Sequence, residues 1–261
     1  MRIATWNINS LRLRIENLKR FVAEYRPDVL CLQEIKVSDA FFPLQAVKDM
    51  GFPHILYHGM KSYNGVAIFS KAPFLAKSPE YWCKKEDCRH ALAILPGDIA
   101  LHNFYVPAGG DIPDPALNPK FDHKLKFLDE VTAWFKGPAG KGKSIIVGDL
   151  NVAPLEQDVW SHKQLLKVVS HTPIEVEKLT GWQKAGQFVD VLRQFIPEEE
   201  KLYSWWSYRS PDWTKNDRGR RLDHIWVSPE LKPALKKGQI IKEMRGWELP
   251  SDHVPVIVDT H

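Results

Sequence analysis

The chain has 261 residues, of which 44% are hydrophobic and 26% charged, which fits one large or two small globular domains. It contains no stretch near the roughly 20 apolar residues that a membrane span needs, and no apolar leader follows Met1. Its three cysteines form no disulfide framework, and Cys83, Cys88 and His90 are too few local ligands to favour a zinc site. We therefore expect a soluble, cytoplasmic protein that does not bind membranes.

Strand-like and helix-like patterns alternate through the first half of the chain. Residues 3–6 form an apolar run typical of a strand, and residues 10–24 carry apolar side chains at helical spacing. Residues 29–32 predict a buried strand that ends at Gln33 and Glu34. Further strands are predicted at 66–69, 91–95 and 99–106, followed by a Pro/Gly/Asp loop over 109–119.

The second half continues this alternation. A helix is predicted over 122–135, and strands are predicted at 144–147, 221–227, 239–242 and 254–258. Residues 4–9 and 147–151 echo each other, because both are apolar strands that end in an Asn/Asp-aliphatic-Asn corner. The echo suggests two sheets packed face to face under outer helices, with both corners at one edge. No low-complexity linker divides residues 1–261, so we expect a single domain.

Polar side chains stand where several of these strands end. Glu34 follows one strand and Asn7 another, and hard divalent cations such as Mg²⁺ prefer oxygen ligands of these kinds. Taken alone, Glu34 is better explained as a solvated loop start and Asn7 as a turn-forming residue. Their occurrence beside similar corners favours a shared site, because a buried strand holds the group at its end in a fixed place.

The corner at residues 148–151 combines a glycine, a carboxylate and an amide. Asp149 can take a proton from water, and Asn151 can donate to a phosphate oxygen. If the chain continues extended, both side chains project to the same side. The alternative is an Asx turn after a buried strand. Gly148 permits close backbone approach in either case.

A second titratable pair, Asp252 and His253, precedes the last predicted strand. An imidazolium can stabilise a phosphoryl oxygen, and a carboxylate on its other ring nitrogen favours that charged form. Asp223, at the start of a strand, is a candidate for this carboxylate. Tyr105 ends another strand, where its phenol can donate to a phosphate, although a core aromatic explains it equally well. Together the corners predict a metal-assisted phosphodiester hydrolase.

The positive charge lies late in the chain. Residues 203–245 hold ten Lys/Arg and five Asp/Glu, a net charge of +5, whereas the whole chain carries +4. Interleaved aromatic and basic residues can stack on nucleobases and hold phosphates. Trp205 and Trp206 are expected to face opposite ways. The candidate DNA-contacting residues are Trp206, Arg209, Lys215, Arg218, Arg220 and Arg221.

These segments together resemble the exonuclease III family of DNA-repair nucleases, within the endonuclease/exonuclease/phosphatase superfamily. The resemblance spans essentially the whole chain, in the family's order, through residues 6–12, 27–36, 57–59, 65–68, 104–107, 148–151, 203–206, 221–223 and 251–253. It implies a four-layered α/β sandwich of the DNase I-like kind, with two packed mixed β-sheets flanked by helices. It also implies a monomeric, Mg²⁺-dependent hydrolase of double-stranded DNA. The implied activities are incision 5′ to abasic sites, removal of 3′-phosphates and other 3′-blocking groups, and 3′→5′ degradation of duplex ends.

The resemblance implies a metal site as well. Glu34 is the principal ligand of Mg²⁺, or of Mn²⁺ in its place, with Asn7 and Asp252 near the ion. Where a second ion binds, it involves Asp149, Asn151 and His253.

The catalytic roles are carried over in the same way. Asp149 activates water or transfers a proton, and Asn151 stabilises the transition state. Tyr105 contacts the phosphate or the leaving group, and Asp223 orients His253.

Three departures from the family pattern leave the preferred lesion open. Ala108 stands where relatives often carry an Asn or Gln, and Arg220 where some carry a Trp or Leu beside the abasic-sugar pocket. Residues 160–162 are bulkier than the glycine-containing loops of some abasic endonucleases, and a flipped-out sugar needs room. One alternative is therefore an enzyme that cleans 3′ ends with little abasic incision. Others are a ribonuclease or another phosphodiesterase of the superfamily and, far less favoured because every corner residue is present, a non-catalytic DNA-binding module.

Overall fold

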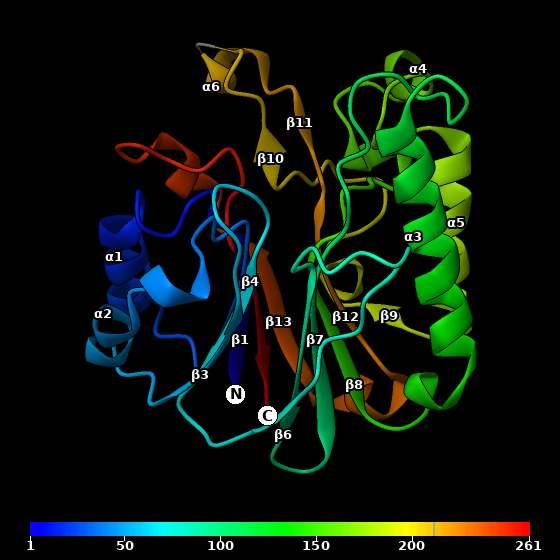
Figure 1. The fold of residues 1–261 in the computed structure, drawn as a ribbon. Helices are drawn as coiled ribbons and strands as arrows, with labels where there is room; N and C mark the ends of the chain where they lie inside the picture. The colour runs from blue at the N-terminus through cyan, green and yellow to red at the C-terminus, as the bar shows by residue number, and fades with distance from the viewer. Residues whose placement is uncertain (211) are drawn as a thin grey trace.

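Two six-stranded β-sheets face each other at the centre of the computed structural model, which describes residues 1–210 and 212–261 (Figure 1). The first sheet contains, in spatial order, β13 (Leu235–Ile240), β14 (Val256–Thr260), β1 (Arg2–Asn7), β2 (Val29–Gln33), β4 (Val66–Ser70) and β3 (His54–His58). The second contains β5 (Leu75–Lys77), β6 (His90–Leu95), β7 (Ile99–Tyr105), β8 (Ser144–Asp149), β12 (Asp223–Val227) and β9 (Val189–Asp190). Both sheets are mixed, because the parallel pairs β1–β2 and β7–β8 lie among antiparallel neighbours.

Helices cover the outer faces of both sheets, which confirms the predicted four-layered sandwich. Figure 1 shows α1 (Ile15–Tyr25) and α2 (Leu44–Asp49) outside the first sheet, and α3 (Pro119–Lys136) and α5 (Pro173–Ala185) outside the second. The short α4 (His162–Leu165) and α6 (Trp213–Asn216) lie at the upper end, beside a two-stranded ribbon of β10 (Trp205–Trp206) and β11 (Gly219–Arg220). In the described part of the chain, no helix combines the length and apolar character needed to cross a membrane.

Three large apolar clusters hold these layers together. The cluster between the sheets includes Ile3, Val29, Val147 and Ile225. A second joins the first sheet to α1, and a third joins the second sheet to α3 and α5. Burial on this scale is the main driving force of folding, and it fixes the positions of the strand ends.

The predicted elements are correct at the centre of each sheet and less accurate at its edge. The strand predicted at 239–242 is β13, which begins at Leu235 and ends at Ile240. The helix predicted over 10–24 begins only at Ile15, because Asn9 and Ser10 have φ angles of 46° and 88°, outside the helical region. The sequence analysis did not find β3 or α5.

Stability is expected to fall at acid pH because two histidines are buried against α3. His90 Nδ1 accepts a hydrogen bond from the Glu80 amide, so its Nε2 carries the proton and donates to His102 Nδ1 at 3.1 Å. Burial lowers the pKa of His102 to about 3 and the pKa of His90 well below 6.5. In the unfolded chain both pKa values lie near 6.5.

Once the pH drops below 6.5, the two histidines therefore bind protons in the unfolded state but not in the folded state. Each histidine should then remove about 1.4 kcal/mol of unfolding free energy per pH unit until its folded pKa is reached. Urea unfolding between pH 7 and pH 5 measures this slope. The variant His102→Gln, which cannot titrate there, should show a shallower slope, and an unchanged slope would contradict the assignment.

Candidate active site

Strand register brings the predicted corner residues to one edge of the sandwich. In the first sheet Asn7 pairs with Gln33, so that Glu34 follows directly beside it. In the second sheet Asp149 pairs with Tyr105 on one side and with Asp223 on the other. The expectation that the two echoing corners meet at one edge is confirmed by a hydrogen bond of 2.8 Å from Asn7 Nδ2 to Asp149 Oδ2.

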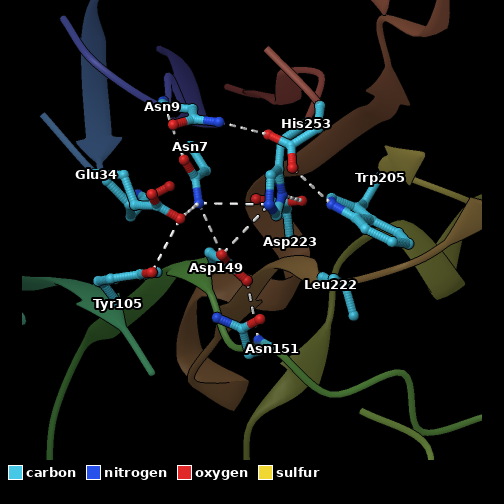
Figure 2. A network of polar contacts seen from close by, with 12 residues as sticks. Asn7, Asn9, Glu34, Tyr105, Asp149, Asn151, Trp205, Leu222, Asp223 and His253 are labelled. Carbon is cyan, nitrogen blue, oxygen red and sulfur yellow. Dashed lines mark hydrogen bonds and ion pairs between the residues drawn. The ribbon is translucent and has the colours of Figure 1, made fainter. Parts of the chain in front are cut away.

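The side-chain amide of Asn7 lies at the centre of this site (Figure 2). Its Nδ2 lies 2.9 Å from Glu34 Oε1, 2.8 Å from Asp149 Oδ2 and 3.4 Å from His253 Nε2. Tyr105 donates from its hydroxyl to the same Glu34 oxygen at 2.9 Å. One fully buried amide therefore donates to a carboxylate of the first sheet and to a carboxylate of the second, and it lies beside the imidazole of His253.

His253 lies between two carboxylates. Its Nδ1 is 2.8 Å from Asp223 Oδ2, and its Nε2 is 3.6 Å from Asp149 Oδ2. Burial lowers the pKa of His253, but attraction to Asp223 and Asp149 outweighs it and raises the pKa to about 10. Ser204 donates to the same Asp223 oxygen at 2.6 Å and so fixes the carboxylate. The imidazole is therefore oriented and charged at neutral pH.

The two carboxylates nearest to Asn7 have opposite electrostatic environments. Burial raises the pKa of Asp149 to about 7, and the attraction of His253 only partly opposes this. Burial also favours neutral Glu34, but the combined effect of Lys36, which lies 2.7 Å from Glu34 Oε2, of the Asn7 hydrogen bond and of His253 outweighs burial and lowers the pKa of Glu34. Glu34 is thus held as an anion. The pKa of Asp149, in contrast, lies close to neutral pH, as expected of a group that exchanges protons.

Asp252 belongs to the same network through other residues. Its two carboxylate oxygens accept hydrogen bonds from Asn9 Nδ2 and Trp205 Nε1, each at 3.0 Å. Asn9 in turn accepts from Lys36, the partner of Glu34. Burial by itself would raise the pKa of Asp252. The charge of His253 and the hydrogen bonds from Trp205 and Asn9 together lower this pKa by a larger amount, so the net shift is downward.

The chain turns directly after β8. Asn151 has a φ of 53°, and its amide donates to Asp149 Oδ1 at 3.0 Å, so the Asx-turn alternative is correct and the extended one is wrong. The Asn151 side chain donates to Val106 O at 2.8 Å. Gly148 has a φ of 140°, and a Cβ at this position would lie 1.9 Å from Phe104 O. Only glycine allows β8 to approach β7 this closely.

An open cleft of about 750 Å³ lies over these residues. At one end Glu34, Asp149, Asn151 and His253 line it, and beyond them the walls are made by the β10–β11 ribbon and neighbouring loops. Residues of that second part include Trp160, Ser170, Trp205, Arg218, Arg220 and Leu222. A polar centre therefore opens onto a partly aromatic, basic subsite.

Comparisons with known proteins identify the family of this chain. The model of the endonuclease/exonuclease/phosphatase family matches residues 4–253. The chain belongs to this family. Exodeoxyribonuclease III of Haemophilus influenzae is 30% identical over 268 aligned residues, which cover 98% of each protein. This chain is therefore a hydrolytic nuclease of the exonuclease III and AP endonuclease kind.

Two solved structures show the same fold over the whole chain. An AP endonuclease from Archaeoglobus fulgidus is 30% identical with a TM-score of 0.92, and the alignment covers 100% of this chain and 99% of that one. A 3′ phosphatase from Neisseria, solved with a product DNA hairpin, is 31% identical with a TM-score of 0.90 and the same coverage. The predicted family and fold class are both confirmed.

The structure corrects one predicted DNA contact of this nuclease. Arg221 has an exposed fraction of 0% and forms ion pairs with Asp158 at 2.8 Å and Asp190 at 2.6 Å. Its guanidinium is therefore held inside the protein, because a buried charge must be paired. Arg221 supports the loop after Asn151 and does not contact DNA.

The other predicted contacts lie at or near the cleft. Arg209, Lys215 and Arg218 are exposed, and Arg218 stacks over Trp160 at 4.6 Å. Trp206 lines the cleft but has an exposed fraction of only 1%, and its Nε1 donates to Asp217. Trp205 is the more exposed of the pair, consistent with opposite facing.

Part of the excess positive charge of residues 203–245 lies away from the cleft. Lys237 pairs with Asp259, near the end of β14 that is farther from His253. The exposed Lys236 and Lys237 therefore occupy an edge strand away from the cleft. Only part of the late basic segment can form the electrostatic surface that the charge count suggested.

Several residues that support the site were not predicted from the sequence. Asn9 and Lys36 connect Asp252 to Glu34, and both stand in segments that already carried the resemblance. The Ser204 hydroxyl donates a hydrogen bond to the Asp223 carboxylate and accepts hydrogen bonds from the backbone amides of Leu222 and Asp223. Its position directly before the aromatic pair Trp205 and Trp206 was the available signal. The His90 ring nitrogens contact Glu80 and His102, so neither is available to a metal at Cys83 or Cys88.

Proposed function

We propose that this nuclease is a Mg²⁺-dependent DNA-repair hydrolase that incises 5′ to abasic sites, removes 3′-phosphates and other 3′-blocking groups, and degrades duplex ends 3′→5′. The single observation that carries this proposal is the Asn7 amide, which lies within hydrogen-bonding distance of Glu34, Asp149 and His253. A candidate metal ligand, a candidate base and an imidazolium are thereby assembled around the space of one phosphate.

The charge and chemistry of the site suit a hard divalent cation. When all four carboxylates of the site are ionised, they face two cationic side chains, which leaves two negative charges that a divalent ion would neutralise. The carboxylates are Glu34, Asp149, Asp223 and Asp252, and the cations are Lys36 and His253. The donors are oxygen atoms, which Mg²⁺ prefers and Mn²⁺ accepts. Such an ion would offset charge on the scissile phosphate.

Glu34 would be the principal ligand, with Asn7 and Asp252 beside it. Asp149, Asp223 and His253 also lie within 4.8 Å of one another, in the manner of a metal site. Both His253 ring nitrogens, however, already contact a carboxylate in that group. We therefore propose one ion at Glu34 rather than a second ion at His253.

The remaining side chains would divide the chemistry of hydrolysis. Asp149 would take a proton from the attacking water, which Asn151 helps to position. His253, oriented by Asp223, would donate to a phosphoryl oxygen and stabilise the charge that develops there. Burial and Glu34 raise the pKa of Tyr105 well above 10, so its hydroxyl stays protonated and can donate to the phosphate or the leaving group.

The cleft supports both abasic incision and 3′-end cleaning. Of the bulky residues at 160–162, Trp160 lines the cleft, whereas His162 hydrogen-bonds to His171 at 2.8 Å and lines a separate cavity. Of these two residues only Trp160 therefore borders the cleft, and we expect an extruded nucleotide to enter beside it. The described relatives include both an AP endonuclease and a 3′ phosphatase. The alternative, 3′-end cleaning with little abasic incision, differs only in the relative rates.

A direct assay tests the proposed function. One labelled duplex carries a single abasic analogue, and a second carries a nick with a 3′-phosphate, each incubated with Mg²⁺ or with EDTA. We expect cleavage of both in Mg²⁺ and of neither in EDTA. Cleavage of the nicked duplex alone would select the 3′-end alternative, and activity in EDTA would contradict the metal site.

The variant Glu34→Gln should change the metal requirement. The amide keeps the hydrogen bonds from Asn7 and Tyr105 possible but removes the charge that attracts the ion. The Mg²⁺ concentration for half-maximal activity should rise by at least about tenfold. A Mg²⁺ titration of the cleavage rate measures this, and an unchanged midpoint would exclude Glu34 as the principal ligand.

A further inference from the structure

A buried amide lies in an apolar layer between the two sheets. Asn103 in β7 stands two residues before Tyr105, so it points to the same face of the strand, and it is fully buried. Its neighbour in register is Val147 in β8, and the neighbour of Val147 in β12 is Ile225. Val147 and Ile225 both belong to the apolar cluster between the sheets. Among these three strands, Asn103 is therefore the only polar side chain in the layer beneath the candidate active site.

The side chain of Asn103 is bonded to the opposite sheet. Its nitrogen donates to the carbonyls of Leu32 and Ala67, each at 2.9 Å, and so spans the paired strands β2 and β4. Its oxygen accepts a hydrogen bond of 2.6 Å from Gln33 Nε2. Gln33 Nε2 also donates to Thr5 Oγ1 in β1 at 2.9 Å. One side chain of the second sheet is thereby connected to three strands of the first.

These bonds fix an alignment that apolar packing leaves loose. Burial of apolar surface has no preferred direction, so it holds two sheets together without fixing how far one slides along the other. Hydrogen bonds to backbone carbonyls have a narrow range of distance and angle, and they are strong in a dry core. Gln33 Oε1 is buried and finds no donor in residues 1–210 and 212–261, which lowers stability. The network is therefore better explained by the alignment it imposes than by stability.

The alignment matters because the proposed reaction divides between the sheets. Glu34 directly follows β2 and Asn7 ends β1, so these two candidate metal ligands belong to the first sheet. Asp149 and Tyr105 end strands of the second sheet, as Figure 2 shows. The hydrogen bond of 2.8 Å from Asn7 to Asp149 crosses between the sheets, and so does the bond of 2.9 Å from Tyr105 to Glu34. Sliding of one sheet would change both distances.

We propose that Asn103 is a positioning residue, which together with Gln33 locks the sheet that carries the metal ligands against the sheet that carries the base. This inference rests on the proposed function. Asn103 is buried and touches no substrate, so it acts through Asp149 and Tyr105, whose strands it aligns with the first sheet. A misplacement of about 1 Å at a reaction centre lowers the rate by about 10²-fold. The amide bridge of Asn103 and Gln33 should therefore affect turnover rather than binding.

The variant Asn103→Leu tests the proposal, because leucine branches at the same carbon but forms no side-chain hydrogen bond. For the abasic duplex, kcat should fall by at least about tenfold. KM and the Mg²⁺ concentration for half-maximal activity should change little, because the candidate metal ligands stay together in the first sheet. Glu34→Gln should instead raise that Mg²⁺ concentration. An unchanged kcat in Asn103→Leu would overturn the proposal, and so would a Mg²⁺ requirement that rises as kcat falls.

The matched control is Ile225→Ala. Ile225 lies in the same layer, but its side chain only packs in the apolar cluster between the sheets. Its removal leaves a cavity, so the urea midpoint should fall more than in Asn103→Leu, while kcat changes little. If kcat falls with stability in both variants, the loss of rate follows loosened packing, and Asn103 has only a structural role.

The double variant Gln33→Leu/Asn103→Leu separates stability from rate further. Replacing both polar partners by apolar side chains leaves no unpaired amide of this pair in the core, so the urea midpoint should return toward that of the unaltered protein. The kcat should stay low, because the apolar pair does not restore the alignment. Recovery of kcat together with stability would show that the amide bridge supports only the fold.

A measurement without turnover separates this inference from the proposed function. His253, which precedes β14, contacts Asp223 of β12 through Nδ1 at 2.8 Å, so this bond also joins the two sheets. The proton in it gives a downfield NMR signal, assigned by its loss in His253→Ala. Asn103→Leu should shift or broaden this signal, whereas Ile225→Ala should not. If the unaltered protein cleaves no abasic duplex, the proposed function fails, yet the signal still decides the alignment, and an unmoved signal in Asn103→Leu excludes it.

Discussion

Replacing Asp149 with asparagine is expected to lower the cleavage rate by about 10²- to 10⁴-fold, the contribution of a positioned general base. The amide has the same shape and can still accept the hydrogen bond from the Asn151 backbone, but it cannot take a proton from water. Single-turnover cleavage of the abasic duplex in Mg²⁺ measures the loss. Binding of the same duplex should change little, because Asp149 is buried, whereas Arg209 and Arg218 are exposed elsewhere on the cleft and Lys215 is exposed close to them in the chain.

His253→Ala should show the same separation of cleavage from binding. This change removes the imidazolium that lies between Asp149 and Asp223. Stabilisation of charge by such a donor inside a buried site is worth about 10²- to 10³-fold in rate.

The matched control for both variants is Asp129→Asn, which removes an exposed carboxylate on α3 that pairs with Lys178. It should leave cleavage unchanged. A parallel loss of cleavage and DNA binding in Asp149→Asn or His253→Ala would mean that these residues hold DNA rather than promote its hydrolysis.

Strand ends were predictable because an apolar run followed by a polar corner is a local signal. Asn7, Glu34 and Asp149 each follow such a run, and the structure places each at a strand end or directly after it. The echo between residues 4–9 and 147–151 also predicted correctly that the corners meet. The hydrogen bonds and ion pairs that join side chains of one sheet to those of the other could not be predicted from the sequence, because they depend on how the two sheets are placed relative to each other.

Arg221 shows where local reasoning failed. The charge count gave Arg221 the same weight as Arg218 or Arg220, yet its side chain is buried between β11 and β12. Its acidic partners, Asp158 and Asp190, stand 63 and 31 residues away in the sequence, so no local pattern identifies them. A charge count therefore overestimates a DNA-binding surface when buried ion pairs lie within the segment.

The missed helix α5 had a local signal that could have been used. Thr172 accepts a hydrogen bond from the Glu175 amide, and the Glu175 side chain accepts from the Thr172 amide, which is a capping box with Pro173 at the first helical position. Glu175 also has a function that this motif does not reveal. Its carboxylate is buried and faces Lys124 of α3.

Lys124→Met is expected to lower the free energy of unfolding by about 3–5 kcal/mol, because it leaves Glu175 as an unpaired buried charge. Lys124 Nζ contacts Glu175 Oε1, Asn151 O and Ala108 O, and both charged side chains are fully buried. Urea unfolding measures the change through the midpoint at constant slope. A loss below about 1 kcal/mol would show that Glu175 is satisfied by Ser170 and Thr172 alone.

The double variant Lys124→Met/Glu175→Gln separates the two functions of this pair. Neutralising both partners removes the unpaired charge, so much of the lost stability should return. Cleavage should remain impaired, because the ammonium also holds the carbonyl of Asn151 at 2.8 Å and so fixes the turn that carries the amide we propose to act in catalysis. If stability and activity recover together, the ion pair supports only the fold. If stability alone recovers, Lys124 positions Asn151 for catalysis, and a buried contact behind the cleft sets the rate at its surface.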